Sequence, residues 1–231
     1  MSVKSKVFAA AATLTLVGGV GVAGLATAGA ANAATPSCGH DCIDVFSHQF
    51  GTFADPSFVM DSYKQGDAAG TPVILFRTSN SDPAEDFTVS NEGLVSQFYA
   101  LGLVSPEVEL HYLNNYAYEF MYSPYGVQTG LCTGVAATAV NGEHVTLQPC
   151  GVSSKTLWIT DSHSGALTAH AEPLINGSDT NFSTPYGMTY GQSSYPTDTP
   201  RPPLYTESIL GFSNNTINSN QEWSADGGVL P

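Results

Sequence analysis

Serine, histidine and acidic side chains are the residues of this 231-residue chain that could carry out hydrolysis. Asp161, Ser162 and His163 have the residue types of a hydrolytic triad, but they are adjacent in the chain and cannot all face one another. Neither a Gly-x-Ser-x-Gly turn nor a His-Glu-x-x-His helix occurs. With 20 acidic residues, pairs such as Glu85 and Asp86 arise freely, and a glycoside hydrolase needs two opposed carboxylates. The sequence therefore predicts no catalytic residues, with an atypical glycoside hydrolase as an alternative.

Four cysteines are the other reactive side chains. An even number in an exported chain indicates two disulfides, for which three pairings are open. We favour Cys38 with Cys42 and Cys132 with Cys150, because the members of each pair are close in sequence. Metal binding by Cys38, His40 and Cys42 would need a second ligand cluster at zinc spacing, which the sequence lacks. We expect neither a metal nor another cofactor.

The N-terminus has the pattern of a secretory signal peptide. Lys4 and Lys6 precede an apolar run rich in Gly and Ala over 7–29, and Ala-Asn-Ala at 31–33 supplies a small-x-small cleavage site. An uncleaved membrane anchor is the alternative, since the run is long enough to span a bilayer. Its small residues, and the lack of any Lys or Arg behind it until Lys64, favour cleavage. The sequence predicts a secreted, extracellular protein.

We expect removal of residues 1–33 to leave 34–231 as a single domain, long enough to bury a sizeable core. The whole chain carries a net charge of −14, and loss of the two lysines makes the mature form more acidic. Such a chain repels phosphate backbones and anionic lipids, which predicts no nucleic-acid partner and no membrane partner for the mature form. Nothing in the sequence indicates the oligomeric state.

Short β-rich runs separated by turn residues such as Asn141-Gly142 make up the mature sequence. Helical periodicity is hard to find in it. The pattern predicts an all-β protein, either barrel-like or a β-sandwich. The expected strands are 57–63, 72–77, 87–89, 108–113, 118–122, 145–148, 157–160 and 204–210.

Internal repetition distinguishes the two architectures. Ser-Pro-Tyr-Gly-Val-Gln-Thr-Gly at 123–130 recurs as Thr-Pro-Tyr-Gly-Met-Thr-Tyr-Gly at 184–191. Phe87, Trp158 and Trp223 each stand in a β-rich run, at intervals of roughly 65 residues. Three units, none of which can bury its apolar face alone, would pack around a common axis. We therefore predict a β-trefoil with long loops, with repeats at about 42–104, 105–170 and 171–231, and a β-sandwich as the alternative.

The second and third units resemble repeats of the ricin-B-type lectins. The matching pattern is Gly-Leu-Cys132, a turn, Val-Thr-Leu-Gln-Pro-Cys150, and then Leu-Trp158. Asn220-Gln221-Glu222-Trp223 matches the family's Asn-Gln-x-Trp signature. The resemblance covers about half of the mature chain and implies a divergent, Gln-x-Trp β-trefoil. It also implies that Trp158, Trp223 and Phe87 are core residues and that Gln221 is a structural hydrogen-bonding residue.

In that family an Asp accepts hydrogen bonds from sugar hydroxyls, an aromatic ring stacks on the sugar, and an Asn completes the polar contacts. The resemblance implies a carbohydrate site in the third repeat with Asn220, Asp198 and either Tyr195 or Tyr205. In the second repeat Gly134 stands where the family has its Asp, which predicts that sugar binding is lost there.

Cys42-Ile43-Asp44-Val45 is similar to the family's Cys-Leu-Asp-Val, but it lies far upstream of the register of Cys132. We interpret it as an N-terminal strand rather than a binding edge. The functional expectation is a secreted, non-enzymatic, lectin-like protein whose partner is a polysaccharide or glycan. An exported trefoil that binds protein, such as a protease inhibitor, is the second hypothesis.

Overall fold

The computed structural model describes residues 38, 42–50, 57–79, 81–161, 171–191, 203–210, 212 and 217–225. Contacts divide the chain into two units, Met1–Ala34 and Thr35–Pro231, and the described residues all belong to the second. The proposed signal peptide, Asp198 and Tyr195 lie outside the described residues.

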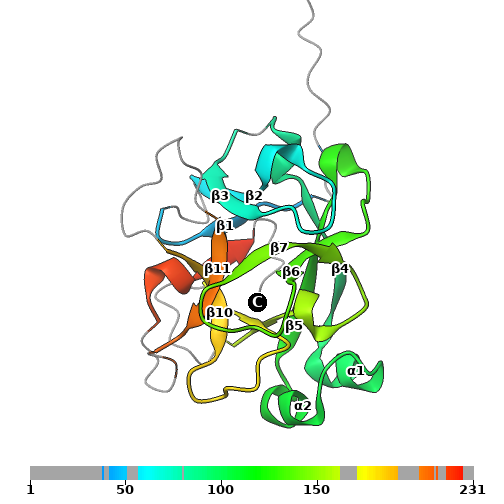
Figure 1. Ribbon diagram of the computed structural model, residues 1–231, viewed down its shortest axis with the longest axis vertical. Helices are drawn as coiled ribbons and strands as arrows, with labels where there is room; N and C mark the ends of the chain where they lie inside the picture. Colours follow the sequence, from blue (N-terminus) through cyan, green and yellow to red (C-terminus); the bar gives the residue numbers. More distant parts are fainter. Residues whose placement is uncertain are drawn as a thin grey trace, which may run out of the picture. The chain divides into compact units, whose positions relative to one another are not determined.

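Strands dominate the described part of the chain, as predicted, and they repeat in three sets of four (Figure 1). The first set is β1 (Val45–Ser47), β2 (Phe58–Ser62), β3 (Val73–Arg77) and β4 (Phe87–Leu94). The second set is β5 (Tyr116–Tyr122), β6 (Leu131–Val135), β7 (Glu143–Pro149) and β8 (Trp158–Thr160). The third set is β9 (Leu174–Asn176), β10 (Tyr186–Tyr190), β11 (Leu204–Ser208) and β12 (Trp223–Ala225).

The hydrogen-bonded ladders follow a threefold pattern. Within each set the first strand pairs with the second, and the second with the third. Between sets, β4 pairs with β5, β8 with β9, and β12 with β1. Within sets, the β5–β8 ladder and the isolated bridges Ile43–Phe87 and Glu172–Trp223 join the chain at the first strand to the fourth strand, so the ring closes. Phe46, Met121 and Ile175 occupy matching places in these ladders. This cyclic, antiparallel arrangement is a β-trefoil, and the β-sandwich alternative is wrong.

Three core aromatics mark the start of the fourth strand of each set. Phe87, Trp158 and Trp223 have no exposed surface and belong to one apolar cluster. The Trp158 indole N–H donates to the carbonyl of Thr133 at 3.1 Å, and the Trp223 indole N–H donates to the carbonyl of Met188 at 2.8 Å. Thr133 and Met188 are themselves equivalent in the β6 and β10 ladders. The aromatic landmarks of the sequence are therefore structurally equivalent.

The Pro-Tyr-Gly landmarks are not equivalent. Pro185 comes directly before β10, whereas Pro124 begins the 3₁₀ turn η4 (Pro124–Gly126) and is separated from β6 by four more residues. The two copies serve different local structures, because Tyr125 has a positive φ of 55° that an extended strand cannot use. An alignment of 123–130 with 184–191 therefore places the second and third repeats in the wrong register.

Two short helices interrupt the β pattern between β4 and β5. They are α1 (Val95–Ala100) and α2 (Pro106–Tyr112), which lie together at the lower right of Figure 1. The predicted strand at 108–113 is therefore wrong. The hydroxyl of Ser105 accepts from the backbone N–H of Val108, and Pro106 follows it at the first helical position, a combination that starts a helix.

The helices give the barrel a second apolar cluster on its outer side. Val95, Phe98 and Val108 pack there with Ile159 and Ile175 of the strands. Within the described residues, no helix is long and apolar enough to cross a membrane.

Short 3₁₀ turns precede each of the three core aromatics. They are η3 (Pro83–Glu85), η5 (Ser154–Thr156) and η8 (Ser219–Gln221), and each ends two residues before the aromatic. A further turn, η2 (Tyr63–Gln65), follows β2. The last residues of the three turns, Glu85, Thr156 and Gln221, therefore hold equivalent places.

Both favoured disulfide pairings are present. Cys132 and Cys150 have Cα atoms 5.0 Å apart and join the start of β6 to the end of the β6–β7 hairpin. Cys38 and Cys42 have Cα atoms 5.5 Å apart and close a local loop before β1.

Candidate functional site

Each repeat has two positions that face one another. They correspond to the Asp and to the Gln of the ricin-B-type pattern. In the second repeat they are Gly134 and Thr156. In the third they are Thr189 and Gln221, and in the first they are Asp61 and Glu85, by the ladder register that aligns β2, β6 and β10. Each repeat therefore presents a different pair of side chains at the same place.

Asp44 does not occupy this place, although its Cys-Ile-Asp-Val setting is similar to the family motif. It lies directly before β1, in agreement with the interpretation of this stretch as an N-terminal strand. Asp61 of β2 is the residue equivalent to Gly134. The equivalence of Asp61 and Gly134 could not be recognised from the sequence, because no cysteine precedes Asp61 at the family spacing.

The second repeat has no room for a sugar-binding Asp. A Cβ atom on Gly134 would lie 2.7 Å from the carbonyl oxygen of Lys155 and 2.9 Å from the Thr156 methyl group. Real Cβ atoms do not come this close to backbone, so any larger residue would force η5 away from β6. The side chain of Thr156 instead donates to the buried carboxylate of Glu119 at 2.5 Å. In the second repeat, η5 therefore fills the space where a sugar would bind.

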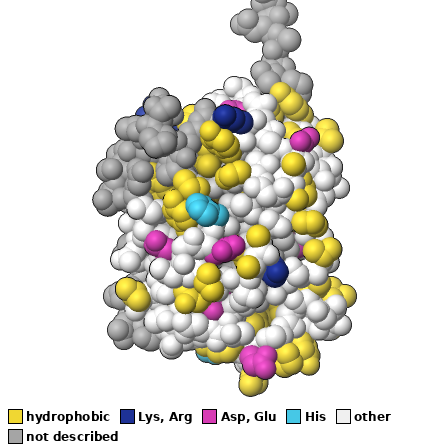
Figure 2. All heavy atoms as spheres, in the orientation of Figure 1, with side chains coloured by type: hydrophobic (Ala, Val, Ile, Leu, Met, Phe, Trp, Pro, Cys, Tyr) yellow, Lys and Arg dark blue, Asp and Glu magenta, His cyan; other side chains and the backbone are white. Residues whose placement is uncertain are grey.

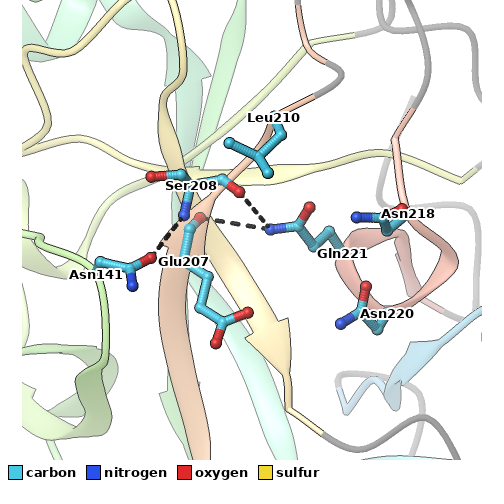
Figure 3. Close-up of a pocket in the computed structure, with 7 residues that line it drawn as sticks. All are labelled: Asn141, Glu207, Ser208, Leu210, Asn218, Asn220 and Gln221. Carbon is cyan, nitrogen blue, oxygen red and sulfur yellow. Dashed lines mark hydrogen bonds between the residues drawn. The ribbon is translucent and has the colours of Figure 1, made fainter.

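The third repeat is open, with a pocket of about 430 Å³ beside Gln221 (Figure 3). The pocket lies between the end of β11, the turn before β7 and the η8 turn. Its lining is polar apart from one exposed leucine. The lining residues are Asn141, Glu207, Ser208, Leu210, Asn218, Asn220 and Gln221.

Gln221 is the most buried of the lining residues, with 3 % of its surface exposed. Its Nε2 donates to Thr189 Oγ1 at 3.0 Å and approaches the carbonyl oxygens of Glu207 and Ser208 at 3.4 Å each. Three acceptors around one atom fix the amide orientation, because an oxygen there would face them without a proton. Gln221 Oε1 is therefore directed the other way, toward Leu210 in Figure 3, and accepts no hydrogen bond from any described residue.

Two backbone-directed contacts hold the rest of the pocket in place. The Nδ2 of Asn220 donates to the carbonyl of Tyr190 at 2.9 Å and ties η8 to β10. The Oδ1 of Asn141 accepts from the backbone N–H of Ser208 at 3.2 Å and ties the β6–β7 turn to β11. Asn220, the predicted sugar-contacting residue, is half-buried. It donates one amide N–H to the fold, so its oxygen and its second N–H remain for a ligand.

Tyr205 lies on β11, the strand that carries Glu207 and Ser208, but it does not line the pocket. It pairs with His144 of β7, and their rings stand 4.8 Å apart between centroids. A Cβ on Gly191 would come within 3.3 Å of the Tyr205 ring, so the ring rests against this glycine. The structure thus places Asn220 and Gln221 in the pocket and puts Tyr205 along the same strand outside it.

Among the described residues that line the pocket, Glu207 is the one ionisable side chain. Its polar atoms include the three asparagine amides, one carboxylate and the free oxygen of Gln221. Figure 2 shows a small number of charged side chains scattered among hydrophobic and uncharged groups on the face that it draws. Such a lining can exchange several hydrogen bonds with a neutral polar ligand, and it offers no counter-charge to an anion.

Asn141, Asn218, Glu207, Ser208 and Leu210 were not anticipated as site residues. The sequence did contain one signal for the site, because Asn218 and Asn220 directly precede the Gln-x-Trp signature within a run rich in asparagine. Asn141 and Glu207 come from other elements, and only the pairing of β7 with β11 brings them to η8.

No protein-family model and no curated protein matches the sequence. Among solved structures, the designed three-fold symmetric protein ThreeFoil is similar with a TM-score of 0.52 at 11 % identity, over 80 % of this chain and 98 % of that one. An exo-beta-1,3-galactanase from Clostridium thermocellum is similar with a TM-score of 0.52 at 10 % identity, over 81 % of this chain. A mosquitocidal holotoxin is similar with a TM-score of 0.50 at 12 % identity, over 80 % of this chain.

The chain spans 30 % of the galactanase chain and 17 % of the holotoxin chain. The match to nearly all of ThreeFoil supports one complete trefoil between Thr35 and Pro231. At these identities the similarity concerns the fold alone. The protein has the all-β, β-trefoil fold.

Proposed function

We propose that this protein binds carbohydrate, non-enzymatically, through the pocket of its third repeat. The observation that carries the proposal is the buried Oε1 of Gln221, which has no hydrogen-bond donor among the described residues. A buried polar atom without a partner costs free energy, on the order of 1–3 kcal/mol, unless a ligand or water satisfies it. A sugar hydroxyl donates one hydrogen bond and accepts others, so it can meet this oxygen and the surrounding amides together.

The remaining lining groups suit a ring of hydroxyls. The Glu207 carboxylate and the asparagine side chains supply acceptors and donors on several sides of the pocket. The exposed Leu210 adds an apolar contact, which the C–H face of a sugar requires. The volume of about 430 Å³ lies within the usual range of small-molecule pockets.

The lining also predicts which sugars are preferred. Glu207 is the one charged side chain among the described residues that line the pocket, and the whole chain carries −14. Uronic and sialic acids would bring a carboxylate toward a carboxylate, with like-charge repulsion and no compensating base. Neutral and amino sugars avoid this penalty, and a longer glycan could continue over the Tyr205–His144 ring pair.

Binding of neutral, amino and uronic sugars by the purified protein, on a glycan array and by calorimetry, tests the proposal. We expect binding of a neutral or amino sugar that Glu207→Gln and Asn218→Ala weaken by about tenfold each, the loss of one ligand hydrogen bond. Glu143→Gln is the matched control, since Glu143 lies on the neighbouring strand β7 and does not line the pocket. Absence of binding to every glycan, or equal binding by all three variants, would contradict the proposal.

The proposal includes secretion, which the signal-like N-terminus supports through its Lys4, Lys6 and Ala-Asn-Ala pattern. A secreted binding domain would meet polysaccharides outside the cell, and its two disulfides suit an oxidising compartment.

A further inference from the structure

Three acidic side chains come together in the first repeat, at the place that corresponds to the pocket of the third. Asp61 of β2 has no exposed surface, and Glu85 at the end of η3 has 3 % exposed. Asp82, which caps the start of η3, completes the group. Oxygen atoms of all three carboxylates lie within 4.8 Å of one another.

The threefold repeat shows what is unusual about this pair of positions. In the third repeat, the residues at the places of Glu85 and Asp61 are Gln221 and Thr189, a donor and an acceptor that form a 3.0 Å hydrogen bond. In the first repeat both places hold carboxylates. Ionised carboxylates are acceptors only, so two of them face each other favourably only with a proton or a cation between them.

The carboxylates are held in position by donors from their own surroundings. The backbone N–H of Ser79 donates to both oxygens of Glu85, at 3.1 and 3.0 Å. The side chain of Gln65 donates to Asp82 Oδ1 at 3.1 Å.

A second feature is the hydroxyl of Tyr122. It is buried, on a side chain with no exposed surface, and forms no hydrogen bond within the described part of the chain. Tyr122 pairs with Phe87, and Phe87 stands two residues after Glu85. Burial raises the pKa of Tyr122, and the negative charges of Asp61, Asp86 and Asp82 act in the same direction. A phenol in this position can bind a cation directly or donate to a water molecule on it.

The geometry points to a divalent-cation site formed by Asp61, Asp82 and Glu85, with Ca²⁺ as the ion. Ca²⁺ binds carboxylate oxygens at about 2.3–2.6 Å, so oxygens on opposite sides of one ion are about 5 Å apart, close to the spacing of this group. Three ionised carboxylates more than offset the charge of the divalent ion. The site differs from the cysteine and histidine cluster considered in the sequence, because its ligands come from β2 and η3 and meet only in the fold.

Calcium binding by the full-length protein tests the site, first by thermal unfolding with CaCl₂ against EGTA and then by calorimetry with CaCl₂. We expect a higher Tm with calcium, because an ion that binds only the folded state stabilises it. The expected Kd is about 10⁻⁴ to 10⁻³ M, the range of extracellular calcium modules. Terbium provides a third readout, since a bound Tb³⁺ ion near Tyr122 should luminesce when the tyrosine is excited.

Two variants separate loss of the site from loss of the fold. Glu85→Gln removes one ligand without changing the size of the side chain and should weaken calcium binding about tenfold or more. The double variant Asp61→Thr with Glu85→Gln copies the Thr189–Gln221 pair of the third repeat, so it should fold and lose the calcium response. Glu207→Gln, in the other repeat, is the matched control and should keep the full response.

An unchanged Tm and no binding heat in the wild-type protein would overturn the site. An equal calcium response in wild-type protein and both first-repeat variants would also overturn it, because the ion would then bind elsewhere. A double variant that fails to fold is replaced by Asp82→Asn, whose half-exposed side chain can be changed with less effect on the core. Glycan binding through the third repeat is measured separately, so failure of either proposal leaves the other standing.

Discussion

Three side chains that end the 3₁₀ turns give each repeat a different local chemistry. Glu85, Thr156 and Gln221 hold equivalent places two residues before a core aromatic. The aromatic has a structural role in all three repeats, whereas the residue two positions before it has diverged. The carboxylate joins an acidic group, the hydroxyl is used internally by Glu119, and the amide opens onto a pocket. Equivalent positions of the trefoil backbone thus hold three side chains with different chemistry.

At the same scale, the core aromatics predict a measurable loss of stability. Trp158→Ala and Trp223→Ala should each lower the free energy of unfolding by about 3–5 kcal/mol, because each removes a fully buried ring and leaves a cavity. Each also leaves a buried carbonyl acceptor, on Thr133 or Met188, without its indole donor. Urea unfolding followed by circular dichroism measures the change.

Val127→Ala is the control for both tryptophan variants, since 65 % of the Val127 side chain is exposed and its truncation should change stability little. A Trp223→Ala variant as stable as Val127→Ala would mean that the Gln-x-Trp match does not mark a core position.

At the scale of elements, loops and hairpins account for the departures from threefold symmetry. The α1–α2 insertion follows β4, and no helix of this kind follows β8 in the described residues. The insertion covers the outer side of the barrel with its own apolar cluster, which the other strands reach through Ile159 and Ile175. Both strands keep their ladder register beneath it, so the insertion adds to the trefoil without altering it.

The Cys132–Cys150 disulfide belongs to this scale because it fastens one hairpin. Replacing both cysteines by serine should lower the free energy of unfolding by about 2–5 kcal/mol, the usual loss for a native disulfide in a small secreted domain. Non-reducing peptide mapping should link Cys132 to Cys150 and Cys38 to Cys42. A peptide that joins Cys42 to Cys150 would be incompatible with the β6–β7 register.

At the scale of the whole molecule, closure of the ring is the main source of cooperativity. β12 pairs with β1, so residues from the two ends of the described domain, Val45 and Ala225, lie side by side. Contacts this far apart in sequence must form before the barrel closes, and such topologies fold slowly.

Processing is the prediction that belongs to the whole chain. Mass spectrometry of the culture supernatant should detect a protein that begins at Ala34, because the Ala-Asn-Ala pattern ends at Ala33. A protein found only in the membrane fraction, with residues 1–33 retained, would contradict secretion.

The sequence by itself determined the fold class and much of the core. Alternation and turn residues predicted most of the strands, and the intervals between Phe87, Trp158 and Trp223 predicted a threefold repeat. These features are local or periodic, so a single chain displays them directly. The helix α2 was missed because a seven-residue amphipathic stretch resembles a strand, although Ser105 and Pro106 carry a helix-start signal.

Only the tertiary structure decided which polar residues meet. Asn141, Glu207 and Gln221 are far apart in the chain and converge because β7 pairs with β11 and η8 packs beside them. Asp61 and Glu85 likewise approach each other because η3 packs against β2. Their side chains carry no sequence signature, because loop lengths between the repeats vary and the equivalences depend on hydrogen-bonded ladders rather than on spacing. The physical reason is that a trefoil fixes its core by periodic apolar residues, whereas its sites form where separate repeats come together.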